Sequence, residues 1–331
     1  MPPSGDLRPS RPSANERRLS SLRELASNPS FSRFTSSGRI TAPMEHHKPE
    51  SDRLPQDRPG MIADRYLVEV PIHENKAMSS VYLAKDMLTR ELVVVKMASD
   101  PAAKSMSTLS MRREQRALSR IRHPNVVRMR DSGCHEGKMF VVLDYIPGED
   151  LYILQGGYGR LPWSLAGKIS LQLCDALGAA HERGVVHDDM KPENIIITLM
   201  GGLKATLLDF GLAKFMDSAL DDDLRITPGI VVGTFPYMAP ETFDMPHYDH
   251  RADIYSLGVV IYEMVAGRNP FDGENIPEVV DRIINYDPEP PGRRVSLPGC
   301  ADSLIMRAIA KEPKHRFCST SEMRAAILSC T

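Results

Sequence analysis

Near its middle the chain reads His187-Asp188-Asp189-Met190-Lys191-Pro192-Glu193-Asn194, and the apolar run Ile195-Ile196-Ile197 follows at once. Asp209-Phe210-Gly211 comes next, after a second apolar run, and then Gly233-Thr234 and Ala239-Pro240-Glu241. Upstream, Val93-Val94-Val95-Lys96 precedes a segment of helical pattern that carries Glu114. Each fragment alone is a weak signal, but in this order and at these spacings they form a specific one.

The residues around these fragments change from a strand-like to a helical pattern. Short apolar runs predict strands at 66–68, 81–83, 92–95, 126–127 and 139–143. Helical patterns follow at 107–122, 165–183 and 253–266. A small strand-rich part before a larger helical part predicts an α+β fold of two lobes, 61–146 and 147–331, with a cleft between them.

Composition excludes several classes of protein. The 331 residues carry a net charge of −2, which gives no global reason to expect a nucleic acid or an anionic membrane as partner. No apolar run approaches the ~20 residues that span a bilayer, and the first residues lack a signal-peptide pattern. The five cysteines contain no C-x-x-C pair, which argues against a disulfide framework and a zinc site. We expect a cytoplasmic protein.

The first 60 residues differ from the rest. They hold 9 Pro and 11 Ser and few large apolar residues, so we expect a disordered tail. Within it, Leu19, Leu22 and Leu25 have roughly helical spacing. A transient helix explains this pattern, and a docking segment for a regulator is the alternative.

With these motifs the chain resembles the eukaryotic-type protein kinases, and is most similar to bacterial serine/threonine members, over roughly 63–328. Lys191 and Gly233-Thr234 resemble serine/threonine rather than tyrosine kinases. The resemblance implies a bilobal kinase fold that binds ATP with Mg²⁺ or Mn²⁺ and transfers the γ-phosphate to protein substrates. Autophosphorylation and a dimer are further options that the family suggests.

The resemblance also implies site residues whose chemistry fits phosphoryl transfer. Lys96 would hold the α- and β-phosphates, and Glu114 would pair with Lys96 and aim it. Asp209 and Asn194 offer the oxygen ligands that Mg²⁺ prefers. Asp189 would be the base that accepts the proton of the substrate hydroxyl, and Lys191 would stabilise the charge on the transferred phosphoryl group. Thr234 would bond Asp189 or Lys191.

The adenine pocket implied by the resemblance is apolar. Its roof, gatekeeper, hinge and floor would be supplied by Val81, Val94, Leu143, Asp144, Ile146 and Ile196. Glu241 is expected to pair with Arg316, and Asp253 to anchor the catalytic loop.

The phosphate-covering loop departs from the family. The three positions where glycines are expected hold Glu74, Lys76 and Ser79, and the stretch 73–80 contains no glycine. Glycine lets backbone N–H groups approach phosphates closely, and the Glu74 carboxylate would repel them. We expect weaker or altered ATP binding, partly offset by Lys76.

Asp188 is the second departure, because most regulated kinases have an arginine there that pairs with a phosphate. An aspartate would repel a phosphate on Thr227, the expected phosphorylation site. We therefore expect a cation, Arg225 or Lys214, to pair with Asp188 in the absence of phosphorylation.

Two other functions compete with an active protein kinase. The glycine-free loop favours a pseudokinase that acts as a scaffold with weak or no turnover. A small-molecule kinase on the same fold is a third option, which the protein-substrate motif at 233–241 disfavours. Against the pseudokinase, all of the expected lysine, base and metal positions are occupied.

Overall fold

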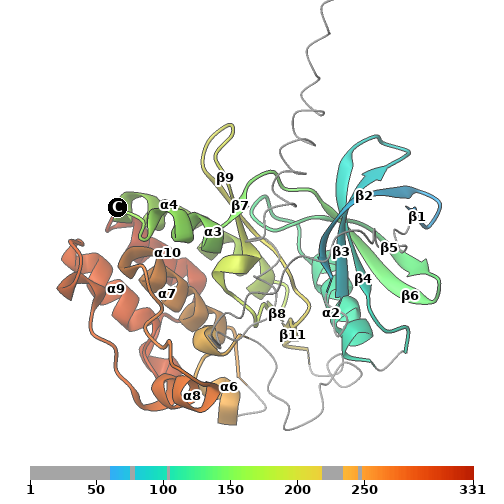
Figure 1. Cartoon of the computed structure of the whole chain (residues 1–331). Coiled ribbons are helices and arrows are strands. Elements are labelled where there is room, and N and C mark those ends of the chain that lie inside the picture. The colour runs from blue at the N-terminus through green and yellow to red at the C-terminus, as the bar shows by residue number, and fades with distance from the viewer. Residues whose placement is uncertain (1–59, 75–78, 103–104, 218–233, 245–247) are drawn as a thin grey trace, which may run out of the picture.

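The computed structural model describes residues 60–74, 79–102, 105–217, 234–244 and 248–331. In Figure 1 the described chain forms a β-rich lobe followed by a larger helical lobe, which is the bilobal α+β fold that the sequence predicts. The predicted tail, apart from Gly60, lies outside the described residues, as do Lys76, Arg225 and Thr227.

The β-rich lobe contains a six-stranded antiparallel sheet in the order β1-β2-β3-β4-β6-β5. The strands are β1 (Met61–Ile62), β2 (Tyr66–Glu74), β3 (Ser79–Asp86), β4 (Leu92–Ala98), β5 (Met129–His135) and β6 (Lys138–Asp144). The predicted strand at 126–127 is wrong, because Val126 makes only an isolated bridge to Leu207. Strand β5 was not predicted, because its residues MRDSGCH lack an apolar run.

Side chains alternate between the two faces of this sheet, as the period of a strand requires. On β4, Val93 and Val95 pack into a small core inside the lobe, together with Tyr82 of β3. Val94 and Lys96, which alternate with them, face the cleft instead. The apolar run at 92–95 therefore determines the face on which Lys96 lies.

One helix, α2 (Met106–Arg120), packs against the sheet and agrees closely with the predicted 107–122. Ser105 caps it by accepting a hydrogen bond from the backbone N–H of Thr108. Met111, Ala117 and Leu118 share its buried face with Glu114. A charged residue on the apolar face of a helix needs a partner, which lies in the cleft.

The larger lobe is built mainly from helices. They are α3 (Leu151–Tyr158), α4 (Trp163–His181), α6 (Glu241–Asp244), α7 (Arg251–Ala266), α8 (Ile276–Asn285), α9 (Gly299–Ala308) and α10 (Thr320–Leu328). The short strands are β7 (Glu149–Asp150), β8 (Val185–Val186), β9 (Ile195–Thr198), β10 (Lys204–Leu207) and β11 (Lys214–Phe215). α7 is buried along most of its length, and Gly258 allows α9 to approach, since a Cβ there would lie 2.7 Å from Ala308 Cβ.

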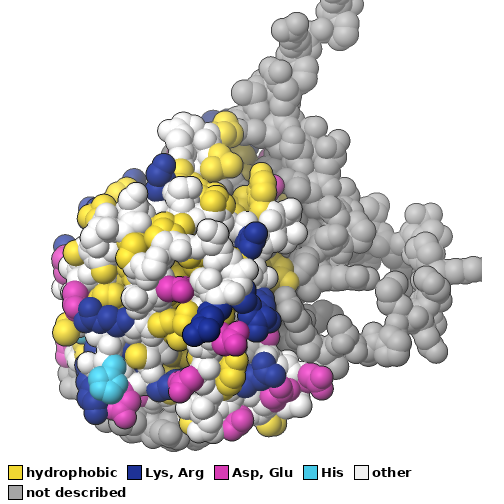
Figure 2. Space-filling model, turned by 90° about the vertical axis from the view of Figure 1, so that its left-hand side faces the viewer, with side chains coloured by type: hydrophobic (Ala, Val, Ile, Leu, Met, Phe, Trp, Pro, Cys, Tyr) yellow, Lys and Arg dark blue, Asp and Glu magenta, His cyan; other side chains and the backbone are white. Residues whose placement is uncertain are grey.

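The outer face of this lobe carries mixed charges. In Figure 2, Lys and Arg side chains lie among Asp and Glu side chains. Ion pairs join Arg307 to Glu322 and Arg324 to Asp175 between the helices. None of the described helices is long and apolar enough to cross a membrane.

Two of the five cysteines form a disulfide, against which the sequence pattern argued. Cys300 at the start of α9 forms a disulfide with Cys330, which follows α10. Trp163 Nε1 donates a hydrogen bond to the Cys330 carbonyl at 2.9 Å, so the end of the chain is held against α4. The pair was missed because the fold, and not the spacing of 30 residues, brings the two cysteines together.

Candidate active site

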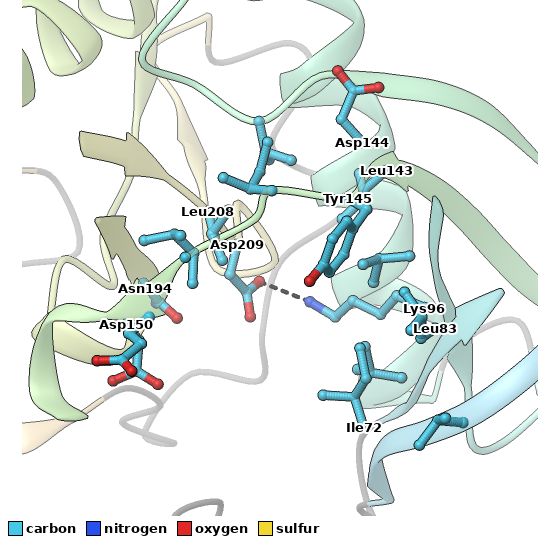
Figure 3. A pocket seen from close by; sticks show the side chains of 18 of the residues that line it. Ile72, Leu83, Lys96, Leu143, Asp144, Tyr145, Asp150, Asn194, Leu208 and Asp209 are labelled. Carbon is cyan, nitrogen blue, oxygen red and sulfur yellow. Dashed lines mark hydrogen bonds and ion pairs between the residues drawn. The ribbon is translucent and has the colours of Figure 1, made fainter. Parts of the chain in front are cut away.

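A cavity of about 330 Å³ lies between the two lobes. Most of its walls are apolar, and the predicted pocket residues all line it: Val81, Val94, Leu143, Asp144, Ile146 and Ile196. In Figure 3 the Asp144 side chain points away from the cavity, and it pairs with Arg130. Asp144 can therefore offer backbone groups, and not its carboxylate, to a ligand in the cavity.

Further wall residues were missed in the sequence. Ile72, Leu83, Val127, Ile153 and Leu208 also line the cavity. Leu83 was open to prediction, because it lies two residues after Val81 on the same face of β3. The others belong to segments whose approach depends on the tertiary fold.

Asp150 was also missed, and it is a polar group on the cavity wall beyond the hinge. It caps α3, since Oδ1 accepts a hydrogen bond from Ile153 N–H at 2.8 Å. Burial raises the pKa of Asp150 to about 6. The carboxylate is placed to accept hydrogen bonds from a ligand that extends out of the apolar part of the cavity.

Lys96 enters the cavity from β4 and joins two carboxylates. Its Nζ lies 2.8 Å from Glu114 Oε2 and 2.8 Å from Asp209 Oδ1, and Figure 3 shows the contact with Asp209 across the cavity. Burial opposes the charge on Lys96, but Asp209 and Glu114 outweigh it and raise its pKa. Burial raises the pKa of Glu114 to about 7, against the attraction of Lys96. The cavity thus holds a fixed positive charge at its inner end.

Asp209 is held in a backbone conformation that non-glycine residues seldom adopt, with φ of 52°. Its Oδ1 also accepts a hydrogen bond from Gly211 N–H at 3.0 Å. The next residue, Phe210, is fully buried and packs against the His187 ring in a T-shaped pair with ring centroids 4.6 Å apart. Burial of Phe210 therefore turns Asp209 toward the cavity, where Lys96 keeps the pKa of its carboxyl low despite desolvation.

The catalytic-loop residues predicted from the sequence form one network. Lys191 Nζ lies 2.8 Å from both Asp189 Oδ2 and Thr234 Oγ1. Thr234 Oγ1 also donates to Asp189 Oδ1 at 3.3 Å. Asn194 Nδ2 donates to the Asp189 carbonyl at 2.8 Å and to Oδ2 at 3.1 Å. Since the amide nitrogen of Asn194 is engaged, its oxygen is the atom left for a metal ion.

Buried groups beneath the loop hold it in place. Asp253 accepts the backbone N–H groups of His187 at 2.8 Å and Asp188 at 3.0 Å. The His187 ring donates from Nε2 to the Leu208 carbonyl, so its Nδ1 is free to accept the Asp189 N–H. Arg316 and Glu241 form a buried bidentate pair with distances of 2.6 and 2.7 Å. The expected contacts of Asp253, Glu241 and Arg316 are all present.

The glycine-free loop is described only at its ends. Ser79 begins β3 and pairs with Ala98 of β4, away from the walls of the cavity. Glu74 ends β2, but its side chain and residues 75–78 lie outside the described part. The effects of Glu74 and Lys76 on a nucleotide remain predictions.

Among the described residues no cation bonds Asp188 directly, although the charge of Lys214 acts on it, and Arg225 lies outside the described part. The hydroxyl of Tyr248 donates a hydrogen bond to Asp188 Oδ2. Lys214 lies over the Tyr248 ring, with Nζ 3.6 Å from the ring centroid. Tyr248 was missed because it belongs to no motif and lies 60 residues from Asp188.

The donor set at the inner end of the cavity fits a metal–nucleotide complex. Mg²⁺ in such sites is bound by one or two protein oxygens together with phosphates. Asp209 and Asn194 carry oxygens of this kind, and Lys96 carries a positive charge beside them. Among the described residues no three His, Cys, Asp or Glu side chains gather into a metal cluster of their own.

Comparison with known proteins gives the same result. The model of the family described as protein kinase domain matches residues 77–326. The chain is 32% identical to the serine/threonine-protein kinase pkn3 of Myxococcus xanthus over 80% of this chain and 50% of that protein. It is 35% identical to the serine/threonine-protein kinase PknE of Mycobacterium tuberculosis over 75% of this chain and 43% of that protein.

A third relative, the serine/threonine-protein kinase PknB of Mycobacterium leprae, is 32% identical over 82% of this chain and 43% of that protein. The chain thus spans half or less of the length of these relatives. The family match covers most of the chain, the fold has two lobes, and the motif residues meet at the cavity between them. The chain therefore belongs to the protein kinase domain family.

Proposed function

We propose that this chain is a serine/threonine protein kinase, which transfers the γ-phosphoryl group of ATP to hydroxyl groups of protein substrates with Mg²⁺ or Mn²⁺. The observation that carries the proposal is that Lys96, Asp209 and Asn194 line one apolar cavity, where Lys96 bonds Asp209 and Asn194 bonds Asp189. We assign residues 61–331 to the kinase domain. A cytoplasmic location would supply the ATP, and autophosphorylation or a dimer is compatible with this function.

The cavity provides for binding and orientation. An adenine ring would pack between Val81, Val94 and Ile196, whose burial in the complex favours a flat apolar ligand. Asp150 would accept hydrogen bonds from the ribose. Lys96, aimed by Glu114, would hold phosphate oxygens, and a bound Mg²⁺ would neutralise the charge that develops on the transferred group.

The catalytic loop provides the chemistry. Asp189 would accept the proton of the substrate hydroxyl as its oxygen attacks phosphorus. Lys191 bonds Asp189 and lies within reach of the same space, so it would stabilise the charge on the phosphoryl group. The hydrogen bonds from Thr234 and Asn194 fix the orientation of the Asp189 carboxylate.

A scaffold without turnover is the second candidate, and the glycine-free stretch 73–80 is what favours it. Lost backbone contacts would reduce the affinity for the nucleotide, but they would leave the base and metal residues in place. We therefore expect a lower affinity for ATP and not a loss of phosphoryl transfer.

The direct test is the transfer of ³²P from γ-labelled ATP to a generic basic protein. The wild type is expected to label serine and threonine, as identified by phosphoamino-acid analysis, and Asp209→Asn is expected to label neither. Equal labelling by both proteins would contradict the proposal.

A further inference from the structure

The backbone conformation of Asp188 determines the direction of its side chain. Its φ of 64° lies in the left-handed region, which aspartate tolerates better than most residues. The backbone N–H donates to the buried Asp253 at 3.0 Å, and this bond holds the conformation. The side chain therefore leaves the catalytic loop in a set direction, next to the base Asp189.

Tyr248 meets this side chain from another part of the lobe. It lies just before α7, and its hydroxyl donates to Asp188 Oδ2. Lys214 covers the ring of Tyr248 and donates from Nζ to the Tyr248 carbonyl at 3.3 Å. A cation over an aromatic face is attracted by the ring, and more strongly where water is partly excluded.

These three residues join segments that the reaction needs in register. Asp188 belongs to the catalytic loop, and Lys214 belongs to β11, five residues after Asp209. β11 pairs with β8, which leads directly into the catalytic loop. Tyr248 is the third member of the group, and it lies after Glu241 in the sequence. Through its hydroxyl and its ring, Tyr248 therefore connects the catalytic loop, the segment that follows Asp209 and the start of α7.

The charges around Asp188 suit a neutral donor better than a phosphate. Burial raises the pKa of Asp188 to about 7, and Asp253 and Asp189 raise it further, while the Tyr248 hydrogen bond and the charge of Lys214 lower it. A phosphate placed here would meet the carboxylates of both Asp188 and Asp253. Such like charges in a partly buried place repel strongly.

We propose that Tyr248 is a positioning residue for phosphoryl transfer, which anchors the catalytic loop through Asp188 and Lys214 in the unphosphorylated chain. It takes the place that a phosphate–arginine pair would otherwise occupy. The inference rests on the proposed kinase function. In it Lys214 acts on Asp188 through its charge and through the Tyr248 ring, while the alternative partner Arg225 lies outside the described residues.

The test uses the full chain after treatment with a phosphatase, and compares wild type, Tyr248→Phe and Tyr286→Phe. Tyr248→Phe removes one hydroxyl and keeps the ring for Lys214, while Tyr286→Phe removes the hydroxyl of an exposed tyrosine after α8. We expect kcat to fall roughly tenfold in Tyr248→Phe, the loss of one hydrogen bond to a charged group, with KM for ATP within about twofold. The control is expected to match the wild type.

An unchanged kcat in Tyr248→Phe would overturn the inference. So would a loss of wild-type kcat on phosphatase treatment that equals the effect of the substitution, because a phosphate would then hold the loop. If the wild type transfers no phosphate at all, the proposed function fails instead.

A double-mutant cycle tests the anchor without any activity. Unfolding free energies are measured for wild type, Tyr248→Phe, Asp188→Ala and the double variant. The strain of alanine at a positive φ appears in both arms and cancels. We expect the second substitution to cost clearly less when the first is present, and additive effects would overturn the anchor.

Discussion

The two sides of the cleft differ in how much of their polar chemistry is held in place. On the side of the catalytic loop, Asp189 is bonded to Lys191, Thr234 and Asn194, and Asp253 supports the backbone beneath it. On the side of the sheet, the described walls are mainly apolar, and Lys96 is the cation among them. The hairpin at 73–80 has no glycine with which to approach a phosphate.

This difference separates two tasks of a kinase. The catalytic loop determines the rate once the nucleotide is bound, and the sheet largely determines how tightly the nucleotide is held. Substitutions on the loop side should therefore act on kcat, and substitutions in the hairpin on KM for ATP.

The largest effect is expected at Asp189. Asp189→Asn preserves the shape but removes the base, so kcat should fall by about a thousandfold with KM for ATP little changed. Steady-state transfer to a basic protein measures both constants. A residual kcat above a tenth of the wild-type value would show that another group accepts the proton.

Lys96→Met is next, with an expected loss of about a hundredfold in kcat/KM. It also leaves Glu114, whose side chain is 1% exposed, without its partner, so the melting temperature should fall. The drop should be greater at pH 8 than at pH 6, because the pKa of Glu114, about 7 in the wild type, rises further and its protonated form tolerates burial.

A matched double variant separates these two consequences. Lys96→Met with Glu114→Gln should regain part of the lost stability, since Glu114 is no longer a buried carboxylate without its cation, although Asp209 still lacks Lys96. It should not regain activity. Recovery of activity would mean that Lys96 acts only by balancing Glu114.

A smaller effect is expected in the hairpin. Glu74→Gly removes a negative charge and restores a glycine, so KM for ATP should fall about fivefold while kcat stays constant. Glu136→Gly is the matched control, since this exposed residue lies on the β5–β6 turn at a φ of 49° that glycine tolerates. An equal fall in KM in both variants would point to net charge and not to the loop.

The smallest effect concerns stability near Asp188. Because its pKa is raised from 3.8 to about 7 in the fold, ionisation opposes folding, and stability is lost as the pH rises from about 4 to 7. Asp188→Asn cannot ionise, and asparagine tolerates the positive φ. We expect the variant to melt about 3 °C above the wild type at pH 8, with a smaller difference at pH 5. Parallel pH curves would contradict this.

Motif residues were predictable because phosphoryl transfer restricts both their identity and their spacing. Lys96, Glu114, Asp189, Asn194 and Asp209 all lie where the sequence placed them. The alternation of side chains along β4 determined that Lys96 faces the cleft. The apolar faces of the long helices allowed their bounds to be predicted within a few residues.

Contacts that depend on tertiary packing could not be read from the sequence. Tyr248 reaches Asp188 only because β11 and the start of α7 meet beside the catalytic loop. Cys300 meets Cys330 because α9 and α10 pack against each other, so that the end of α10 lies beside the start of α9. β5 was missed because its strand state comes from pairing with β6 and not from its own polar residues.

The central claim is that the catalytic side of the cleft is intact beneath an altered phosphate loop. It is tested most directly by kcat and KM from an ATP titration into the millimolar range, with Asp189→Asn as the blank. The account predicts a kcat of about 1–100 s⁻¹ with a KM for ATP near the upper end of the usual range, about 1 mM. Transfer at saturating ATP that does not exceed the Asp189→Asn blank would contradict it.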